Sequence, residues 1–231
     1  MSIKVVVFDI GGTLMEYRDM PNSWVDFYPK AFDHVNEKLA LGLTEDELEK
    51  SLEILLTYNP RLHYRERDFS PEHIFKAVTA DWEGEFNIND VINAFFESMQ
   101  LVPYLFPESI AVLEKLHEQG IKTAALTDVA CGMPDEMQIG YFSDVMPYFD
   151  EYVSSVNCGY RKPSPVGLER IAARFGADKS EMIFVGDEEK DIKTADRFGC
   201  ISVLIDRKHS GNNFGQAHTI TKLTELFSIL I

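Results

Sequence analysis

The chain has 231 residues, which is enough for one well-buried core and a smaller inserted domain but too few for several independent units. Its 22 Lys and Arg residues stand against 38 Asp and Glu residues, and the resulting formal charge of −16 repels nucleic acid and anionic lipid. No apolar run approaches the roughly 20 residues that a membrane helix needs. The charge and the absence of such a run together lead us to expect neither nucleic acid nor a membrane as a partner.

The N-terminus and the cysteines indicate the compartment. The apolar run 5–8 is too short for a signal peptide and is followed at once by Asp9. The three cysteines, Cys131, Cys158 and Cys200, are odd in number, widely spaced and without a CxxC pair, which favours neither a disulfide framework nor a zinc site. These features predict a protein of the reducing cytoplasm.

Short β-branched apolar runs alternate with longer amphipathic stretches through much of the chain. The predicted strands are 3–8, 122–126, 152–154, 182–185 and 201–205, and the predicted helices between them are 108–119, 165–175 and 192–198. Gly120 and Gly199 follow two of these helices, and glycine commonly ends a helix. This alternation is typical of a parallel sheet wound with crossover helices, so we predict an α/β core.

The stretch from about residue 24 to residue 100 has a different pattern. Helical spacing recurs around 27–41, 45–58, 70–82 and 89–99, with no convincing strand. Thr44 with Glu47, and Ser70 with Pro71, are typical helix starts. We therefore predict a discontinuous core of residues 1–18 and 102–231, with an all-helical cap of residues 19–101 inserted into it.

The first strand ends at the edge where an open α/β sheet places its ligand crevice. Asp9 follows the buried strand directly, and Gly11 and Gly12 come next. Glycines let the main chain approach a bound anion or metal closely. The same residues also suit a simple tight turn, so this segment alone leaves both interpretations open.

Three later strands end in comparable polar segments. Thr127 offers a hydroxyl to a phosphoryl oxygen, although a threonine there also suits a helix N-cap. Lys162 offers a point charge to an anion, or is a solvated loop lysine. Asp187 and Asp191 span a strand end and a helix start, where carboxylates either bind Mg²⁺ or favour the helix N-terminus.

Together these segments supply a nucleophile, a hydroxyl, a lysine and metal-binding carboxylates, in that order along the chain. The segments Asp9-Ile10-Gly11-Gly12-Thr13, Leu126-Thr127-Asp128, Arg161-Lys162-Pro163 and Gly186-Asp187 through Asp191 resemble the four ordered motifs of the haloacid dehalogenase superfamily. The resemblance implies a Rossmann-like parallel sheet core and a helical cap that closes over the site.

The resemblance also implies a Mg²⁺-dependent phosphatase that acts on a small phosphorylated metabolite. Asp9 would attack phosphorus and form an aspartyl-phosphate, while Thr127 and Lys162 would orient and neutralise the phosphoryl oxygens. The implied metal ligands are Asp9, the backbone carbonyl of Gly11, Asp187 and Asp191, and the implied substrate-binding residues are Gly12, Thr127, Asp128 and Lys162.

Gly11 departs from the superfamily pattern, because phosphatases of this kind usually carry a second Asp there that protonates the leaving group and activates water. General acid–base catalysis is typically worth about 10² to 10⁴ in rate. Its loss should slow the hydrolysis of alkyl phosphates most and that of acyl or aryl phosphates least. Asp128, Glu16 and Asp19 are candidates for supplying the proton from another direction. Dehalogenases also lack this Asp, but they use no metal and do not need the paired carboxylates.

Two alternatives stay open. The first is a dehalogenase or a phosphonate-cleaving hydrolase, and the second is a catalytically weak protein that binds phosphate or a metabolite. Phosphonate cleavage in this superfamily needs a cap lysine, for which Lys30, Lys38, Lys50 and Lys76 are candidates by location.

We expect substrate choice to lie in the cap. Residues 61–67 are the densest basic and aromatic patch of the chain and could meet an anionic or aromatic leaving group. The same patch also suits a solvated loop with internal Glu–Arg pairing. Trp24 and Phe27 either line the pocket or pack in the core.

Overall fold

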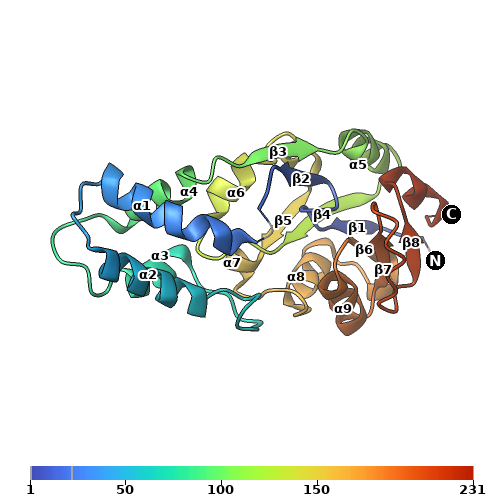
Figure 1. Cartoon of the computed structure of the whole chain (residues 1–231). Coiled ribbons are helices and arrows are strands. Elements are labelled where there is room, and N and C mark those ends of the chain that lie inside the picture. The colour runs from blue at the N-terminus through green and yellow to red at the C-terminus, as the bar shows by residue number, and fades with distance from the viewer. Residues whose placement is uncertain (1, 22, 231) are drawn as a thin grey trace.

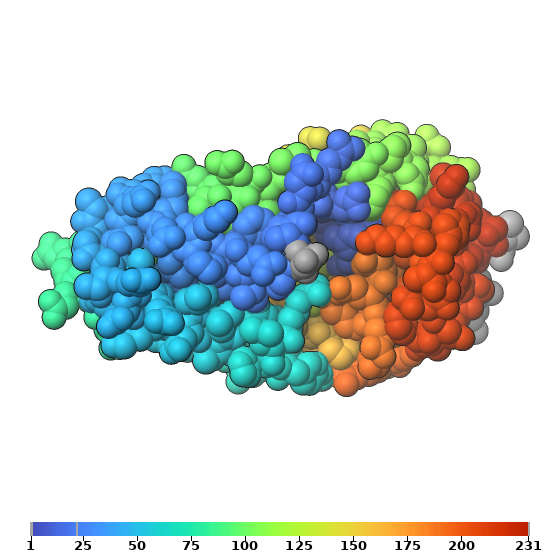
Figure 2. Space-filling model, in the orientation of Figure 1, coloured from blue at the N-terminus to red at the C-terminus, as the bar shows by residue number. Residues whose placement is uncertain are grey.

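The computed structural model describes residues 2–21 and 23–230. The molecule is elongated, with a helix-flanked sheet toward one end and a group of helices toward the other (Figure 1). The two parts meet along the middle of the molecule, where blue and cyan atoms of the N-terminal half lie against orange atoms of the C-terminal half (Figure 2).

The core contains a six-stranded sheet in the order β5-β4-β1-β6-β7-β8, and every neighbouring pair in it is parallel. Its strands are β1 (Val5–Phe8), β4 (Lys122–Thr127), β5 (Glu151–Ser154), β6 (Met182–Gly186), β7 (Ile201–Ile205) and β8 (His218–Ile220). The predicted parallel α/β sheet is confirmed. Because β1 lies between β4 and β6, the carboxyl ends of these three strands meet at one edge.

Both faces of the sheet are covered, which explains why β1 is an unbroken apolar run. The core helices are α5 (Ser109–Glu118), α6 (Asp135–Gly140), α7 (Ser155–Cys158), α8 (Val166–Phe175) and α9 (Glu189–Phe198). Val5 and Val7 pack on one face with α8 and α9, whereas Val6 and Phe8 pack on the other with α5. Short 3₁₀ helices occupy Met146–Tyr148, Lys179–Glu181 and Leu223–Ser228.

The region predicted as a cap is helical. A 3₁₀ turn at Trp24–Phe27 leads into α1 (Tyr28–Lys38), α2 (Glu45–Thr57), α3 (Pro71–Val78) and α4 (Ile88–Glu97). Their apolar faces converge on buried aromatic residues, among them Phe32, Phe75 and Phe95. The predicted starts at Thr44 and Ser70 are helix caps, since each hydroxyl accepts the backbone N–H three residues ahead. Within the described residues, no helix is both long and apolar enough to cross a bilayer.

A two-stranded antiparallel ribbon connects the helical region to the core. It consists of β2 (Met15–Arg18) and β3 (Val102–Leu105), and the sequence patterns did not predict it. Both strands have four residues and are partly exposed, so neither has a strong apolar signature. The predicted boundaries after residue 18 and before residue 102 fall at the outer ends of these strands.

Helix α9 begins at Glu189, three residues earlier than predicted. Its first turn is polar, so the apolar spacing that marks the helix starts only at Ile192. The Asp191 carboxylate accepts the Glu188 backbone N–H at 2.9 Å and thereby caps this helix. Strand β8 was also missed, because a three-residue edge strand has too little periodicity to detect.

Candidate active site

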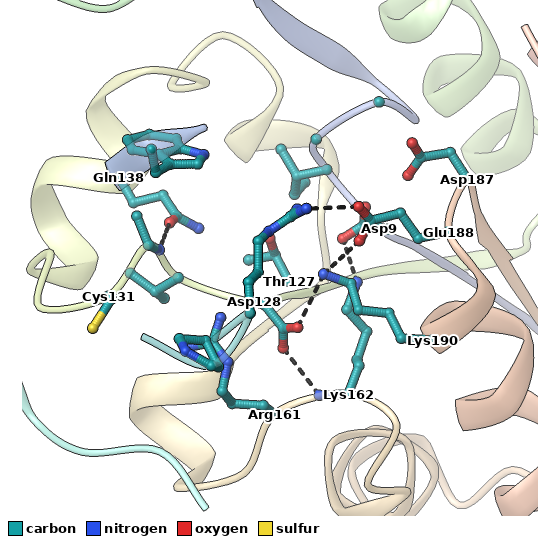
Figure 3. Close-up of a pocket in the computed structure, with 18 of the residues that line it drawn as sticks. Asp9, Thr127, Asp128, Cys131, Gln138, Arg161, Lys162, Asp187, Glu188 and Lys190 are labelled. Carbon is teal, nitrogen blue, oxygen red and sulfur yellow. Dashed lines mark hydrogen bonds and ion pairs between the residues drawn. The ribbon is translucent and has the colours of Figure 1, made fainter. Parts of the chain in front are cut away.

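A cavity of about 580 Å³ lies between the helical region and the carboxyl edge of the sheet. The sequence-predicted residues that line it are Gly11 and Gly12, together with Asp9, Thr127, Asp128, Lys162 and Asp187, which are labelled in Figure 3. Asp9 and Asp187 directly follow β1 and β6, and Thr127 is the last residue of β4. Lys162 lies in the loop between α7 and α8, beyond the end of β5. Asp191 is the remaining predicted residue and lies behind Lys162, almost fully buried.

Lys162 links the carboxylates of Asp9 and Asp191. Its Nζ lies 2.6 Å from Asp9 Oδ1 and 2.6 Å from Asp191 Oδ1, and all three side chains are buried. The backbone on both sides is fixed, since the Asp9 N–H donates to the Val185 carbonyl at 2.8 Å and the Lys162 N–H donates to Asp128 Oδ1 at 3.0 Å. Burial lowers the pKa of Lys162, but Asp191 and Asp9 outweigh burial, so the pKa is raised well above its usual value and the amine stays charged.

Asp9, Asp187 and Asp191 form an all-oxygen cluster that fits a hard divalent cation. One carboxylate oxygen from each lies within 4.8 Å of the other two. Asp187 Oδ1 is sequestered from solvent and accepts no hydrogen bond from any residue that the structure describes. A buried oxygen without a donor, beside two further carboxylates, is the environment that Mg²⁺ satisfies.

Gly12 gives Asp187 the space that it occupies. Its φ is +78°, in the left-handed region, and a Cβ built there would lie 2.1 Å from Asp187 Oδ2. Any side chain at position 12 would therefore displace this carboxylate. Gly11 is different, because its backbone is outside the left-handed region and a Cβ would meet no described atom within 4 Å.

Two carboxylates of this cluster, those of Asp9 and Asp187, have raised pKa values. Burial, with repulsion from Asp191 added, raises the pKa of Asp9 to about 7 even though Lys162 opposes the shift. Burial and the charges of Asp9 and Asp191 raise the pKa of Asp187 to about 8. Without a cation, the folded protein thus holds protons that the unfolded chain releases near pH 4.

The stability of the metal-free protein should therefore fall as pH rises. Below about pH 4 the acids are protonated in both states, and between about pH 4 and pH 8 only the folded protein keeps these protons, so unfolding becomes easier through that window. Asp187→Asn removes one of the crowded charges. We expect it to raise the metal-free melting temperature by at least about 3 °C at pH 8.5 and to change it little at pH 4.5.

Thermal melts of chelator-treated protein at both pH values measure this effect. Glu189→Gln is the matched control, because Glu189 is exposed and pairs with Lys193 at the surface. An equal shift in the melting temperature of the Asp187→Asn variant at both pH values would show that the charge of this carboxylate does not cause the loss of stability at high pH.

The sequence interpretation gave no role to Lys190, which lies inside the site. Its Nζ is 2.6 Å from Glu188 and 3.3 Å from Asp128. Burial raises the pKa of Glu188, but Lys190 outweighs it and the net pKa is lowered to about 2. The sequence shows a lysine between Asp187 and Asp191, but it does not predict the direction in which that side chain points.

The candidates for a replacement acid differ in their positions. Asp128 faces Lys190 and accepts the Lys162 N–H, and these cationic neighbours outweigh burial, so its pKa is lowered and it is a poor proton donor. Glu16 lines the cavity and is exposed, whereas Asp19 lies outside the cavity wall. Glu16 is thus the best placed of the three.

The helical region contributes Trp24 and the 59–65 loop to the cavity wall. Arg61 reaches across to Glu188 at 3.1 Å, and Tyr64 and Arg65 also line the cavity. Trp24 packs edge-on against Tyr17, which lines the same wall. Phe27 instead packs with the apolar cluster of the helical region.

The four lysines considered for phosphonate chemistry, Lys30, Lys38, Lys50 and Lys76, are exposed and are not among the residues that line the cavity. Lys38 pairs with Glu97 and Lys76 with Glu72, both on the helical region itself. A lysine that forms a Schiff base with substrate must reach the reacting carbon, so their placement disfavours that reaction.

Comparisons with known proteins show the family to which this chain belongs. The family model described as haloacid dehalogenase-like hydrolase matches residues 3–199. The chain is 28% identical over 206 residues to the glyceraldehyde 3-phosphate phosphatase of Methanopyrus kandleri, covering 89% of this chain and 84% of that protein.

Two solved structures share the fold. A HAD phosphatase from Thermococcus onnurineus has a TM-score of 0.65 at 23% identity, covering 99% of this chain and 98% of that one. A 2-haloacid dehalogenase from Pseudomonas syringae also has a TM-score of 0.65, at 20% identity and the same coverage. Since the family model matches residues 3–199, a range that includes Asp9, Lys162 and Asp187, this protein belongs to the haloacid dehalogenase-like hydrolases.

Proposed function

We propose that this protein is a Mg²⁺-dependent phosphatase of the cytoplasm that acts on a small phosphorylated metabolite through an aspartyl-phosphate at Asp9. The observation that carries the proposal is the oxygen cluster of Asp9, Asp187 and Asp191 beside Lys162. A site built only for carbon–halogen displacement does not need three converging carboxylates. The similarity to the glyceraldehyde 3-phosphate phosphatase of Methanopyrus kandleri supports the same chemistry.

In the proposed reaction, a carboxylate oxygen of Asp9 attacks phosphorus while the bond from phosphorus to the leaving oxygen breaks. Lys162 neutralises phosphoryl oxygens, and Thr127 and the Gly12 main chain orient them. The leaving oxyanion takes a proton from water. A water then cleaves the aspartyl-phosphate, which releases inorganic phosphate and regenerates the Asp9 carboxylate.

Asp9, Asp187 and Asp191, with the Gly11 carbonyl, would hold the cation. When bound, Mg²⁺ would place positive charge between the Asp9 carboxylate and the anionic phosphate, whose approach is otherwise strongly repulsive. Asp191 would bind the cation through one carboxylate oxygen, while its Oδ2 accepts the Glu188 N–H and caps α9. In a chain of charge −16, Lys162, Lys190 and the cavity arginines provide the local positive field that a phosphate needs.

The dehalogenase alternative rests on the missing second Asp and on the shared fold with the Pseudomonas syringae enzyme. The binding-protein alternative rests on Gly11 alone. A panel of metabolite phosphates and 2-haloacids, assayed with and without Mg²⁺, separates them. Metal-dependent phosphate release supports the proposal, halide release supports a dehalogenase, and phosphate binding without turnover supports a binding protein.

We expect the wild-type enzyme to depend steeply on its leaving group, because Gly11 offers no side chain to protonate the departing oxygen. Acetyl phosphate and p-nitrophenyl phosphate, whose leaving anions are stable, should be cleaved at least about 10²-fold faster than a sugar phosphate. Rates of phosphate release across a series of leaving-group pKa values measure this dependence.

Gly11→Asp should flatten that dependence by restoring proton delivery. The backbone and the open space at position 11 accept a side chain, so the variant should fold. We expect a gain of about 10-fold to 10²-fold on sugar phosphates and little change on acetyl phosphate. Gly11→Asn is the control of equal shape without an acid, and an equal gain in both variants would show that proton transfer is not the cause.

A further inference from the structure

The loop after α2 pairs with the core directly before Lys162. The Asp68 N–H donates to the Gly159 carbonyl at 2.9 Å, and the Arg161 N–H donates to the Glu66 carbonyl at 2.6 Å. Between these two bonds, Arg67 and Tyr160 form an antiparallel bridge. This contact, which we call the 66–68 strap, is separate from β2 and β3 and lies where the cyan part of the chain meets the orange part (Figure 2).

The strap contains a buried ion pair. Asp68 Oδ2 lies 2.6 Å from Arg161 Nη1, and the two side chains are only 3% and 9% exposed. Asp68 Oδ1 accepts from Arg65 Nη2 at 3.2 Å and from the Phe69 N–H at 3.0 Å. Removing the Asp68 charge would leave two guanidinium groups close together without their shared carboxylate, which is strongly unfavourable in a buried place.

Arg161 is the residue before Lys162, so its position sets where the lysine backbone begins. From the core side, the Lys162 N–H is held by Asp128 Oδ1. From the cap side, the Arg161 main chain and side chain are both held by the strap. Lys162 Nζ must reach two carboxylates at once, and small shifts of its backbone would break one of these contacts.

We propose that Asp68 is a positioning residue for Lys162. Its carboxylate holds Arg161, and Arg161 fixes the backbone that presents the lysine to Asp9. The site is then fully assembled only while the strap is docked, which couples the seating of the cap to the electrostatics of phosphate binding. This inference rests on the role given to Lys162 in the proposed function.

Asp68→Asn tests the inference against a matched control, Glu66→Gln. Glu66 belongs to the same strap and pairs with Arg197 at 2.6 Å, but these side chains are 35% and 46% exposed. We expect Asp68→Asn to weaken the binding of inorganic phosphate in Mg²⁺ by about tenfold and to lower kcat by a similar factor. Glu66→Gln should stay within about twofold of wild type, since exposed pairs contribute little.

The effect should disappear when Lys162 is absent. In a Lys162→Met background, adding Asp68→Asn should cause no further loss of inorganic phosphate affinity, because the residue on which Asp68 acts is gone. Losses that add in the double variant would overturn the inference, as would an unchanged kcat in folded Asp68→Asn. If Asp68→Asn does not fold, Arg161→Lys keeps the charge but loses the planar fork and is measured instead.

Hydrogen exchange separates this inference from the proposed function. Backbone amides of 159–162 should exchange faster in Asp68→Asn than in Glu66→Gln, whether or not the protein turns over any phosphate ester. Equal exchange in the two variants would refute the coupling. A wild-type protein that neither binds nor hydrolyses phosphate would refute the proposed function, and the exchange result would still decide whether the strap holds the Lys162 segment.

Discussion

Asp9→Asn should lower phosphatase turnover by at least about 10⁴-fold, because an amide does not supply the attacking oxygen that the covalent step needs. The fold should survive. Burial already raises the pKa of Asp9 to about 7, so the metal-free protein tolerates an uncharged group of this shape at neutral pH. Lys162 keeps Asp191 as its second partner.

Steady-state assays on p-nitrophenyl phosphate, with circular dichroism of both proteins, measure the loss. Asp90→Asn is the matched control, since Asp90 is exposed in the first turn of α4. Mass spectrometry after acid quenching should find phosphate on wild-type Asp9 and none on the variant. Undiminished turnover in a folded Asp9→Asn protein would exclude Asp9 as the nucleophile and with it the proposed mechanism.

Removal of the divalent cation should lower turnover by about 10³-fold or more, and Mg²⁺ should restore it. The physical reason is the crowding of three carboxylates within 4.8 Å, which repel both one another and a phosphate. Because protons compete with the cation for Asp9 and Asp187, more Mg²⁺ should be needed at pH 6 than at pH 8.5.

Titration of chelator-treated enzyme with Mg²⁺ at both pH values tests this prediction. Asp187→Asn should raise the Mg²⁺ concentration that gives half-maximal activity, whereas Glu189→Gln, which alters a surface pair, should not. Full activity in thoroughly stripped wild type would contradict the metal requirement. Halide release from a 2-haloacid under the same conditions would then favour the dehalogenase alternative.

The sequence by itself determined the class of the fold and which residues gather at its edge. Alternation of buried strands with amphipathic helices specifies a parallel sheet, because crossover helices return every strand in the same direction. The carboxyl ends of such strands meet at one edge, so Asp9, Thr127, Lys162 and Asp187 could be assigned to one crevice although they are far apart in the chain. The structure brings them to one cavity.

Elements with few residues or with weak patterning were decided only by tertiary structure. Strands β2, β3 and β8 have three or four residues and lie outside the interior of the main sheet, so their own sequences carry little periodicity. Their pairing is fixed by the neighbours that fold against them. The polar first turn of α9 was hidden for a related reason, since Lys190 and Asp191 contact site residues and Glu189 is exposed, so none of the three adds to the apolar pattern.

Contacts between the helical region and the core also could not be predicted from the sequence. Asp68 and Arg161 are 93 residues apart, and neither has a local pattern that selects the other. Their pairing depends on how α2 and α3 place the loop between them against the segment that contains Lys162. Local periodicity determines which face of a helix or strand is buried, whereas the partner of a buried charge depends on the packing of the whole molecule, which only the folded chain defines.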